Sequence, residues 1–181
     1  MVATRQMSVE EFEATSFEGR WELIDGEVIE MSPSSDVSSS IGLTIGAILW
    51  AHVRPNRLGR LYGADAGFVI FPERPTVRVP DVAFVRADRA PQGEARKHFP
   101  RLAPDLVVEV LSPTDRISDV VAKIEKYQKA VLPLIWLVDP EKMIVTVIAA
   151  GKATAVLTAN DALDGGDIIP GFSVAVSEFF D

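Results

Sequence analysis

Two acids and one lysine have the types and spacing of a site that could bind a metal ion and hydrolyse a phosphoester. Glu109 lies in PDLVVEVLSP, where strand periodicity places Val107, Glu109 and Leu111 on one face. A carboxylate among apolar neighbours needs a compensating partner, so a lysine or a metal ion is expected beside it. A structural salt bridge, or exposure at the rim of the sheet, is the alternative.

Asp81 lies in VRVPDVAFV, and its Pro-Asp pair is repeated at Pro104-Asp105. Such a pair is also a common way to enter a strand. If the strands of Asp81 and Glu109 are neighbours in one sheet, however, both carboxylates can point at one position, where Mg²⁺ or Mn²⁺ would accept carboxylate and water oxygens. Asp105 is an alternative partner, although its place at the start of a strand predicts that it is held less rigidly.

Lys123 lies in the helical segment TDRISDVVAKIEKYQKA. At about 100° per residue, one stripe of this helix is predicted to face the sheet. The stripe comprises Ile117, Val120, Val121, Ile124, Gln128 and Val131. Lys126 and Lys129 fall on the solvent side, whereas Lys123 falls on the border of the stripe, from where it can lean toward Glu109. A surface pair with Asp119, worth roughly a few tenths of a kcal/mol, is the alternative.

Composition narrows the chemistry further. The sequence has no cysteine, which excludes thiolate metal sites and disulfides, and His52 and His98 are its only histidines. Neither histidine accompanies a G-x-S-x-G nucleophile motif, and no glycine-rich nucleotide-binding motif occurs. A net charge of −8 argues against broad binding to phosphate backbones, so any contact with nucleic acid must be local. One candidate is the basic segment Arg86, Arg89, Arg96, Lys97, His98 and Arg101, for which an ordinary solvated loop is the alternative.

The 181 residues, 48% of them hydrophobic, suit a single domain that spans residues 1–181. The most apolar stretch, residues 41–51, is too short to cross a bilayer, and the first residues lack the apolar core of a secretory signal. A cytoplasmic protein with no membrane partner is therefore expected.

Hydrophobic periodicity and turn signals predict the elements that must position these residues. They are a capped helix at 8–14, a hairpin around Asp25-Gly26, a helix at 41–53, strands at 60–71 and 77–85, a charged excursion with one helical turn at 87–104, a strand at 106–111, a helix at 114–130, a strand at 134–138, an edge hairpin at 143–148 and 154–157, and a closing helix at 176–180. The segment 106–138 is predicted to form a βαβ unit with parallel strands.

Six segments of the sequence occur together in a recognisable order. They are WELIDGEVIEMSP, VPDVAFV, PDLVVEVLSPTDR, KIEKYQKA, PLIWLVDP and LDGGDIIPGFSV. In these segments the chain resembles the Uma family of putative restriction endonucleases, within the PD-(D/E)XK nuclease superfamily. The resemblance covers nearly the whole chain. It implies an α/β fold with a restriction-endonuclease-like αβββαβ core, a mixed central sheet flanked by helices, and extra N- and C-terminal β-hairpins.

The resemblance also implies roles for particular residues. Asp81 and Glu109 match the two acids of the family motif and would hold the metal ion. In the general superfamily motif a lysine follows the second acid by two residues, and Leu111 stands at that position here. In the family that this chain resembles the lysine lies on the following helix instead, where it corresponds to Lys123. Glu22 matches a glutamate of the first hairpin that supports the site. Two positions depart from the pattern: the serines around Ser38 replace a histidine, and Val131 replaces a glycine after the helix.

The resulting hypothesis is a metal-dependent endonuclease with DNA as its substrate, Mg²⁺ or Mn²⁺ as its cofactor and a homodimer as its working form. Asp81 and Glu109 are expected to bind the ion, and Lys123 to orient or deprotonate the attacking water or to offset phosphate charge. A catalytically inactive nuclease-fold binding module is the main alternative. A hydrolase of other phosphoesters is a third possibility.

Overall fold

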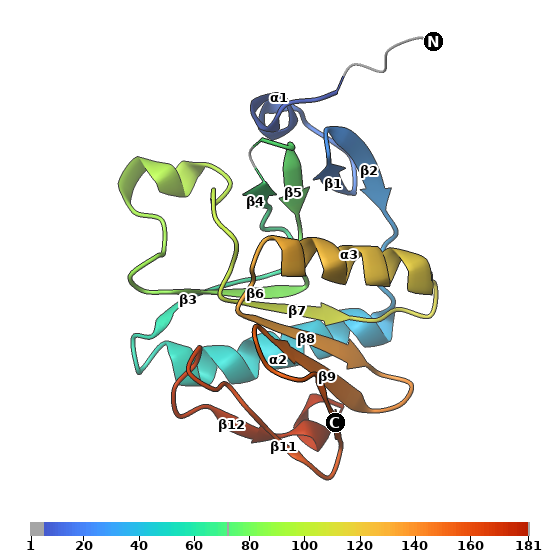
Figure 1. Ribbon diagram of the computed structural model, residues 1–181, viewed down its shortest axis with the longest axis vertical. Coiled ribbons are helices and arrows are strands. Elements are labelled where there is room, and N and C mark those ends of the chain that lie inside the picture. The colour runs from blue at the N-terminus through green and yellow to red at the C-terminus, as the bar shows by residue number, and fades with distance from the viewer. Residues whose placement is uncertain (1–5, 72, 181) are drawn as a thin grey trace.

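A mixed six-stranded sheet forms the centre of the computed structural model, which describes residues 6–71 and 73–180 (Figure 1). Its strand order is β10-β9-β8-β7-β6-β3. The strands are β3 (Gly59–Tyr62), β6 (Val82–Arg86), β7 (Leu106–Val110), β8 (Leu134–Asp139), β9 (Ile144–Ala149) and β10 (Ala155–Thr158). Strands β7 and β8 pair in parallel, and the other neighbours pair antiparallel. The predicted βαβ unit and edge hairpin are confirmed.

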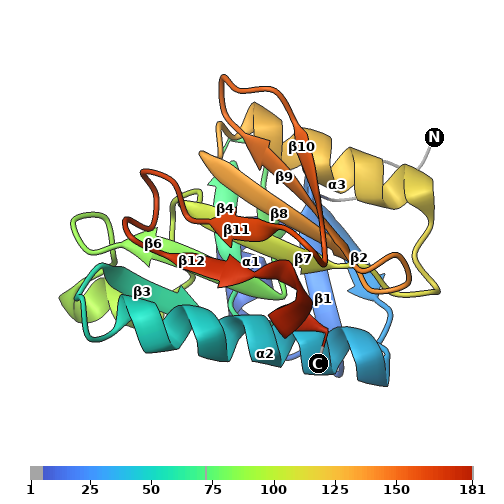
Figure 2. The same cartoon turned by 90° about the horizontal axis from the view of Figure 1, so that it is seen from below.

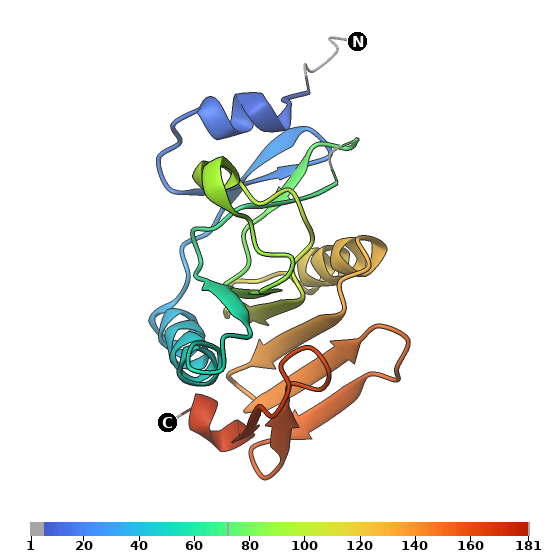
Figure 3. The ribbon, with the colours of Figure 1, turned by 90° about the vertical axis from the view of Figure 1, so that its left-hand side faces the viewer.

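Two helices cover opposite faces of this sheet (Figure 3). Helix α2 (Asp36–Val53) packs Ile45 and Leu49 into one core, which also contains Val108 and Val110 of β7. Helix α3 (Ile117–Lys129) packs Tyr127 into a second core, which contains Val107. Alternation along β7 therefore separates the two cores, and Glu109 faces α3 together with Val107.

A second sheet, of order β2-β1-β5-β4, lies at the N-terminal end of the molecule (Figure 1). Its strands are β1 (Arg20–Ile24), β2 (Glu27–Met31), β4 (Phe68–Phe71) and β5 (Thr76–Arg78). The β1–β2 turn has positive φ angles at Asp25 (51°) and Gly26 (85°), as the sequence predicts. Helix α1 (Val9–Ala14) begins with the expected capping box between Ser8 and Glu11.

The predicted strands at 60–71 and 77–85 are wrong in one respect, because each is broken into two. Strands β3 and β4 belong to different sheets, and so do β5 and β6. Between β5 and β6 the chain passes through Val79, Pro80 and Asp81, and the proline has no N–H to continue a ladder. The break places Asp81 at the junction of the two sheets rather than inside a strand.

Helix α3 is also rotated and shorter than predicted. It begins at Ile117. Two residues of the predicted stripe are largely exposed, Ile117 to 81% and Val131 to 74%. The predicted stripe therefore does not face the sheet as a whole. Tyr127, which lies outside the predicted stripe, is instead the buried residue of the helix. Its large ring fills the contact with the sheet and so sets the rotation of α3.

Lys126 does not lie free on the solvent side as predicted. Its Nζ is 2.5 Å from Oδ2 of Asp25, and its side chain is only 20% exposed. The rotation that buries Tyr127 brings the neighbouring Lys126 against the β1–β2 turn. This turn thereby gains an ion pair with α3.

The C-terminal segment adds a small hairpin at residues where hydrophobic periodicity predicts no strand. Strands β11 (Ala162–Asp164) and β12 (Ser173–Ala175) are followed by the 3-10 helix Val176–Phe179 at the place of the expected closing helix. Figure 2 shows these elements on the α2 side of the sheet, and Leu163 and Val174 extend the core there. A further 3-10 helix, Gly93–Lys97, forms the expected turn of the charged excursion.

Helix α2 is the single candidate membrane span among the residues that the structure describes. It has 18 residues with a hydropathy of 1.2, and 33% of it is buried inside the protein. A core helix of a soluble protein passes the same test of length and composition. Since Ile45 and Leu49 pack on the sheet, the helix serves as one layer of the fold.

A strained valine ends α3. The N–H of Val131 bonds the carbonyl of Gln128, and that of Leu132 bonds the carbonyl of Tyr127, which is the Schellman arrangement. This arrangement needs a left-handed residue, and Val131 has a φ of 57°. A β-branched side chain is disfavoured in that conformation.

Val131→Gly is therefore expected to stabilise the protein by about 1 kcal/mol, because relief of strain outweighs the added entropy of the unfolded chain. Thermal unfolding should show a midpoint raised by about 2–4 °C. Val121→Gly, at a half-exposed position inside the same helix, is the control and should lower the midpoint. A lower midpoint for Val131→Gly would show that the valine side chain contributes more than its backbone strain costs.

Candidate active site

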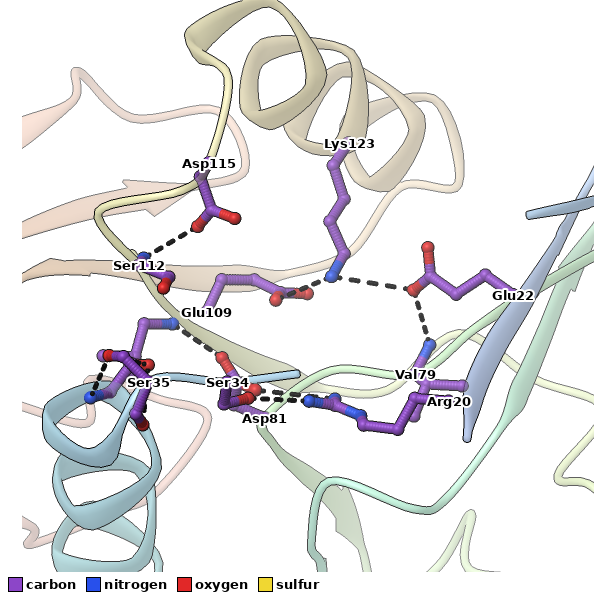
Figure 4. A network of polar contacts seen from close by, with 12 residues as sticks. Arg20, Glu22, Ser34, Ser35, Val79, Asp81, Glu109, Ser112, Asp115 and Lys123 are labelled. Carbon is purple, nitrogen blue, oxygen red and sulfur yellow. Dashed lines mark hydrogen bonds and ion pairs between the residues drawn. The ribbon is translucent and has the colours of Figure 1, made fainter. Parts of the chain in front are cut away.

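Glu109 is bound by two residues of α3. Lys123 donates from Nζ to Oε2 at 2.8 Å (Figure 4), and Tyr127 donates its hydroxyl to Oε1 at 2.6 Å. Lys123 and Tyr127 are four residues apart and so share one face of the helix. The predicted approach of Lys123 to the strand of Glu109 is confirmed. The alternative surface pair with Asp119 does not occur among the described residues.

Glu22 faces the same lysine from the second sheet. Its Oε1 is 3.6 Å from Nζ of Lys123 and accepts the N–H of Val79 at 2.9 Å, while Oε2 lies 2.5 Å from Nη1 of Arg78. The side chain is fully buried. Glu22 on β1 and Glu109 on β7 therefore hold one ammonium group between two sheets (Figure 4).

Asp81 lies beside Glu109 because their strands are neighbours. Strand β6 pairs with β7, with Val82 opposite Val108. Oδ2 of Asp81 accepts the N–H of Val110 at 2.9 Å, which fixes the orientation of the carboxylate. Oδ1 is 3.6 Å from Nη2 of Arg20, and the Asp81 side chain is 18% exposed. The structure thus brings together all four residues that the sequence singled out.

The same surroundings change the pKa values of these groups in different directions. Burial, aided by the negative charge of Asp81, raises the pKa of Glu109 to about 7 despite its bonds to Lys123 and Tyr127. Burial also opposes ionisation of Glu22, but the charges of Lys123 and Arg78 outweigh it and hold that pKa below its ordinary value. Glu22 is therefore the permanent anion of the site.

The pKa of Lys123 responds to both carboxylates. Burial acts to lower it, but Glu109 and Glu22 together raise it above the ordinary lysine value. Burial and the same two acids raise the pKa of Tyr127 well above its ordinary value. Both groups consequently keep their protons at neutral pH, and both are hydrogen-bond donors.

The oxygens of Asp81 and Glu109 suit a hard divalent cation. Among the described residues no group of three or more His, Cys, Asp or Glu side chains is arranged to hold a metal ion. Mg²⁺ does not need such a group, because it commonly binds through one or two carboxylates and completes its shell with water and phosphate oxygens. The two carboxylates also repel each other, which a cation between them would relieve. The donor set fits the predicted ion.

Asp105 is not part of the site, and the expectation that it is weakly held is wrong. It is 2% exposed, accepts the N–H of Arg86 at 2.9 Å and pairs with Arg89 at 2.6 Å. Asp105 directly precedes β7, whereas Glu109 lies near the other end of that strand. Asp105 therefore joins the start of β7 to the end of β6.

The basic segment at residues 86–101 consists largely of ordinary ion pairs. The pairs are Arg86 with Asp88 and Asp105, Arg89 with Asp105, Lys97 with Glu94, His98 with Glu13, and Arg101 with Glu10. Most of the positive charge in this segment is therefore matched by a nearby acid. The solvated-loop alternative describes it better than a nucleic-acid patch does.

Sequence reasoning missed three residues that contact the site acids. Tyr127 could have been found, because it follows Lys123 by one helical turn. Arg78 and Arg20 gave no such signal. The contact of Arg78 with Glu22 depends on the pairing of β5 with β1, and that of Arg20 with Asp81 depends on how the second sheet meets the first. Arg20 also donates to the Ser34 hydroxyl at 2.9 Å, which leads from Asp81 toward the start of α2 (Figure 4).

Comparisons with known proteins give the family and the fold of the chain. The family model Uma2, described as "putative restriction endonuclease", matches residues 9–177. A crystal structure described as a putative nuclease from Anabaena variabilis has a TM-score of 0.82 and 21% identity, covering 96% of this chain and 97% of that chain. At that identity the likeness shows the fold, and the predicted α/β nuclease-like fold is confirmed. No curated protein matches the sequence significantly.

Removal of the buried lysine charge should be costly. Lys123→Met leaves Glu22 and Glu109 without their shared counter-charge, and the expected loss is about 3–5 kcal/mol of unfolding free energy. Urea denaturation measures this loss. Lys129→Met is the control, because Lys129 is 69% exposed and should contribute less than about 0.5 kcal/mol. Equal stability of the two variants would contradict the bridging role of Lys123.

The raised pKa of Glu109 makes the stability of the metal-free protein depend on pH. The folded carboxyl keeps its proton up to about pH 7, whereas the unfolded one loses it near 4.5. The protonated carboxyl of Glu109 therefore makes its full contribution to the free energy of unfolding below pH 4.5. As pH rises from 4.5 to 7, the free energy of unfolding falls by up to about 3 kcal/mol. Glu109→Gln should remove this decline, as measured by urea unfolding in EDTA at several pH values. An identical pH profile in both proteins would contradict the raised pKa.

Proposed function

The chain belongs to the Uma2 family, described as putative restriction endonucleases, and from this membership we propose that it is a divalent-metal-dependent nuclease that hydrolyses DNA phosphodiesters. The observation that carries the proposal is the convergence of Asp81, Glu109 and Lys123 from the junction before β6, from β7 and from α3. Asp81 and Glu109 would hold Mg²⁺ or Mn²⁺. When bound, the ion would activate a water molecule and offset charge on the phosphate.

Lys123 supports hydrolysis as a cation and a donor. Because Glu109 and Glu22 raise its pKa, the ammonium group keeps its proton at neutral pH and is unsuited to act as a base. It can donate a hydrogen bond to the attacking water or to a phosphate oxygen, where negative charge increases in the transition state. Of the roles expected from the sequence, orientation and charge stabilisation fit better than proton abstraction.

Glu22 acts on the substrate only through Lys123. Its carboxylate is fully buried and is bound by Arg78 and the Val79 N–H, so it has no exposed oxygen for a substrate. It therefore serves as a positioning residue that holds the ammonium group at the edge of the site. Homodimerisation and a cytoplasmic location remain predictions from the sequence.

A catalytically inactive binding module is the second candidate. It is favoured by two positively charged side chains, because Lys123 already pairs with Glu109 and Arg20 with Asp81. In such a protein the four charges would be structural, and no ion would be needed. The two candidates differ in whether added metal binds and whether nucleic acid is cut.

Metal titration and a cleavage assay together test the proposal. Calorimetry with Mn²⁺ should detect binding to the wild-type protein that both Asp81→Asn and Glu109→Gln abolish. The same substitutions should lower cleavage of plasmid and oligonucleotide DNA by at least about a hundredfold. RNA and a small phosphodiester are assayed in parallel to separate the substrate classes.

Asp119→Asn is the matched control, because Asp119 is an exposed acid on α3 outside the site. It should bind Mn²⁺ and cut DNA as the wild type does. Circular dichroism of each variant excludes unfolding as the cause of a loss. A wild-type protein that neither binds Mn²⁺ nor cuts any substrate would refute the nuclease proposal and favour the binding module.

A further inference from the structure

A groove begins at Asp81 and runs along the exposed side of α2. Its volume is about 660 Å³. Gly42, Leu43, Gly46 and Trp50 of α2 line one side, and Leu61 and Tyr62 of β3 line the other. A Cβ at Gly42 would lie 3.8 Å from the Cβ of Asp81, so this part of α2 adjoins the candidate active site directly.

Large apolar side chains are exposed along this groove. Leu43 is 77% exposed and Trp50 is 51% exposed. Between them, Gly46 leaves the helix surface low. Exposed apolar side chains of this kind can contact the face of a nucleobase, and an aromatic ring adds a stacking partner that tolerates any base.

Three arginines continue the groove beyond Trp50. A second hollow, of about 380 Å³, shares Trp50 and Leu61 with the first and is lined by Arg54, Arg57 and Arg60. The Arg54 guanidinium lies 4.7 Å from the centre of the Trp50 ring. Among the described residues, none of these three arginines forms an ion pair with a carboxylate. Arg60 donates from Nη1 to the Pro91 carbonyl at 3.0 Å, so Arg54 and Arg57 are the two that face the groove from the end of α2.

These arginines differ in this respect from the basic segment at residues 86–101, where acids neutralise most of the charge. In a chain of net charge −8, uncompensated arginines beside an exposed tryptophan complement a phosphate backbone. Asp65 on the groove wall and Asp81 at its other end repel phosphate. The electrostatic attraction is therefore strongest at the end of α2 remote from the acids.

The dimensions suit a strand of a few nucleotides. An α-helix rises about 1.5 Å per residue, so Trp50 lies about 12 Å and Arg54 about 18 Å along α2 from Gly42. At a rise of about 3.4 Å per nucleotide, these distances correspond to about four and about five nucleotides. The groove is thus long enough to hold the part of a strand next to a bond at Asp81.

We infer that this surface, from Asp81 along α2 to the arginines, binds the nucleic-acid strand that flanks the cleaved bond. An unpaired base stacks on Trp50, and phosphates pair with Arg54 and Arg57. The inference rests on the proposed nuclease function and adds the path of its substrate. DNA and RNA share the chemistry that these residues recognise, and the binding experiment distinguishes them.

Fluorescence anisotropy tests the inference in EDTA, where no metal-dependent cleavage occurs. The probes are labelled unpaired DNA and RNA strands of about 12 nucleotides, within the length range of single-strand sites, and a DNA duplex of the same length. Trp50→Ala should weaken binding of the preferred unpaired strand by about tenfold or more, and Trp50→Phe should restore most of it. Paired Arg54→Gln and Arg57→Gln substitutions should reduce the salt dependence of log K by about 0.7 for each phosphate that the protein no longer neutralises.

Two variants outside the groove serve as controls. Arg101→Gln removes one positive charge from an arginine that pairs with Glu10, and Ile117→Ala removes an exposed apolar side chain from α3. Both should bind each probe as the wild type does. Because Trp50, Arg54 and Arg57 are at the surface, their variants should fold, and circular dichroism checks this.

The outcomes separate this inference from the nuclease proposal. If the Trp50→Ala and arginine variants bind the nucleic-acid probes as tightly as the wild type does, the inference is overturned, even if the wild type cuts DNA. Loss of affinity in these variants would support it, even if no cleavage is found. Sedimentation is measured on the same samples. If Trp50→Ala converts a dimer to a monomer without changing affinity, the groove is a contact between copies of the chain and the inference is wrong.

Discussion

The ammonium group of Lys123 between Glu109 and Glu22 is the interaction on which the rest of the site depends. Its two contacts, at 2.8 and 3.6 Å, come from strands of different sheets, and the lysine itself comes from α3. Burial makes each of these charges costly alone, so the three elements must dock together for any of them to be tolerated. The same contacts raise the pKa of Lys123, so the ammonium group that joins the three elements also stays a hydrogen-bond donor beside the carboxylates.

Asp81 shows how a defect in a strand can create a site. Pro80 lies in the break between β5 and β6, and Asp81, directly before β6, accepts the Val110 N–H from the neighbouring β7. Its charge then acts on Glu109 and contributes to the raised pKa of that acid. In the proposed nuclease, these two neighbouring carboxylates would stabilise a divalent cation, and two residues alone would leave most of its coordination shell to water and substrate.

The two ends of helix α2 carry opposite charge. Its start lies near Asp81, and its end carries Arg54 next to the exposed Trp50. Positive side chains at a helix C-terminus are also favoured by the helix dipole. A net charge of −8 would otherwise repel nucleic acid, so uncompensated arginines concentrated on one short surface attract a strand locally. The acids at the other end remain available to a cation.

Features that depend on local periodicity and turn chemistry could be predicted from the amino-acid sequence. Capping at Ser8, the Asp25-Gly26 hairpin, the buried strand around Glu109 and the approach of Lys123 all follow from spacing along the chain, and the family resemblance added Glu22. The remaining features could not be predicted in this way. Which sheet each half of a broken strand joins, how far α3 rotates to bury Tyr127, and which basic residues meet an acid are set by packing between distant segments. No window of sequence contains both partners of such contacts.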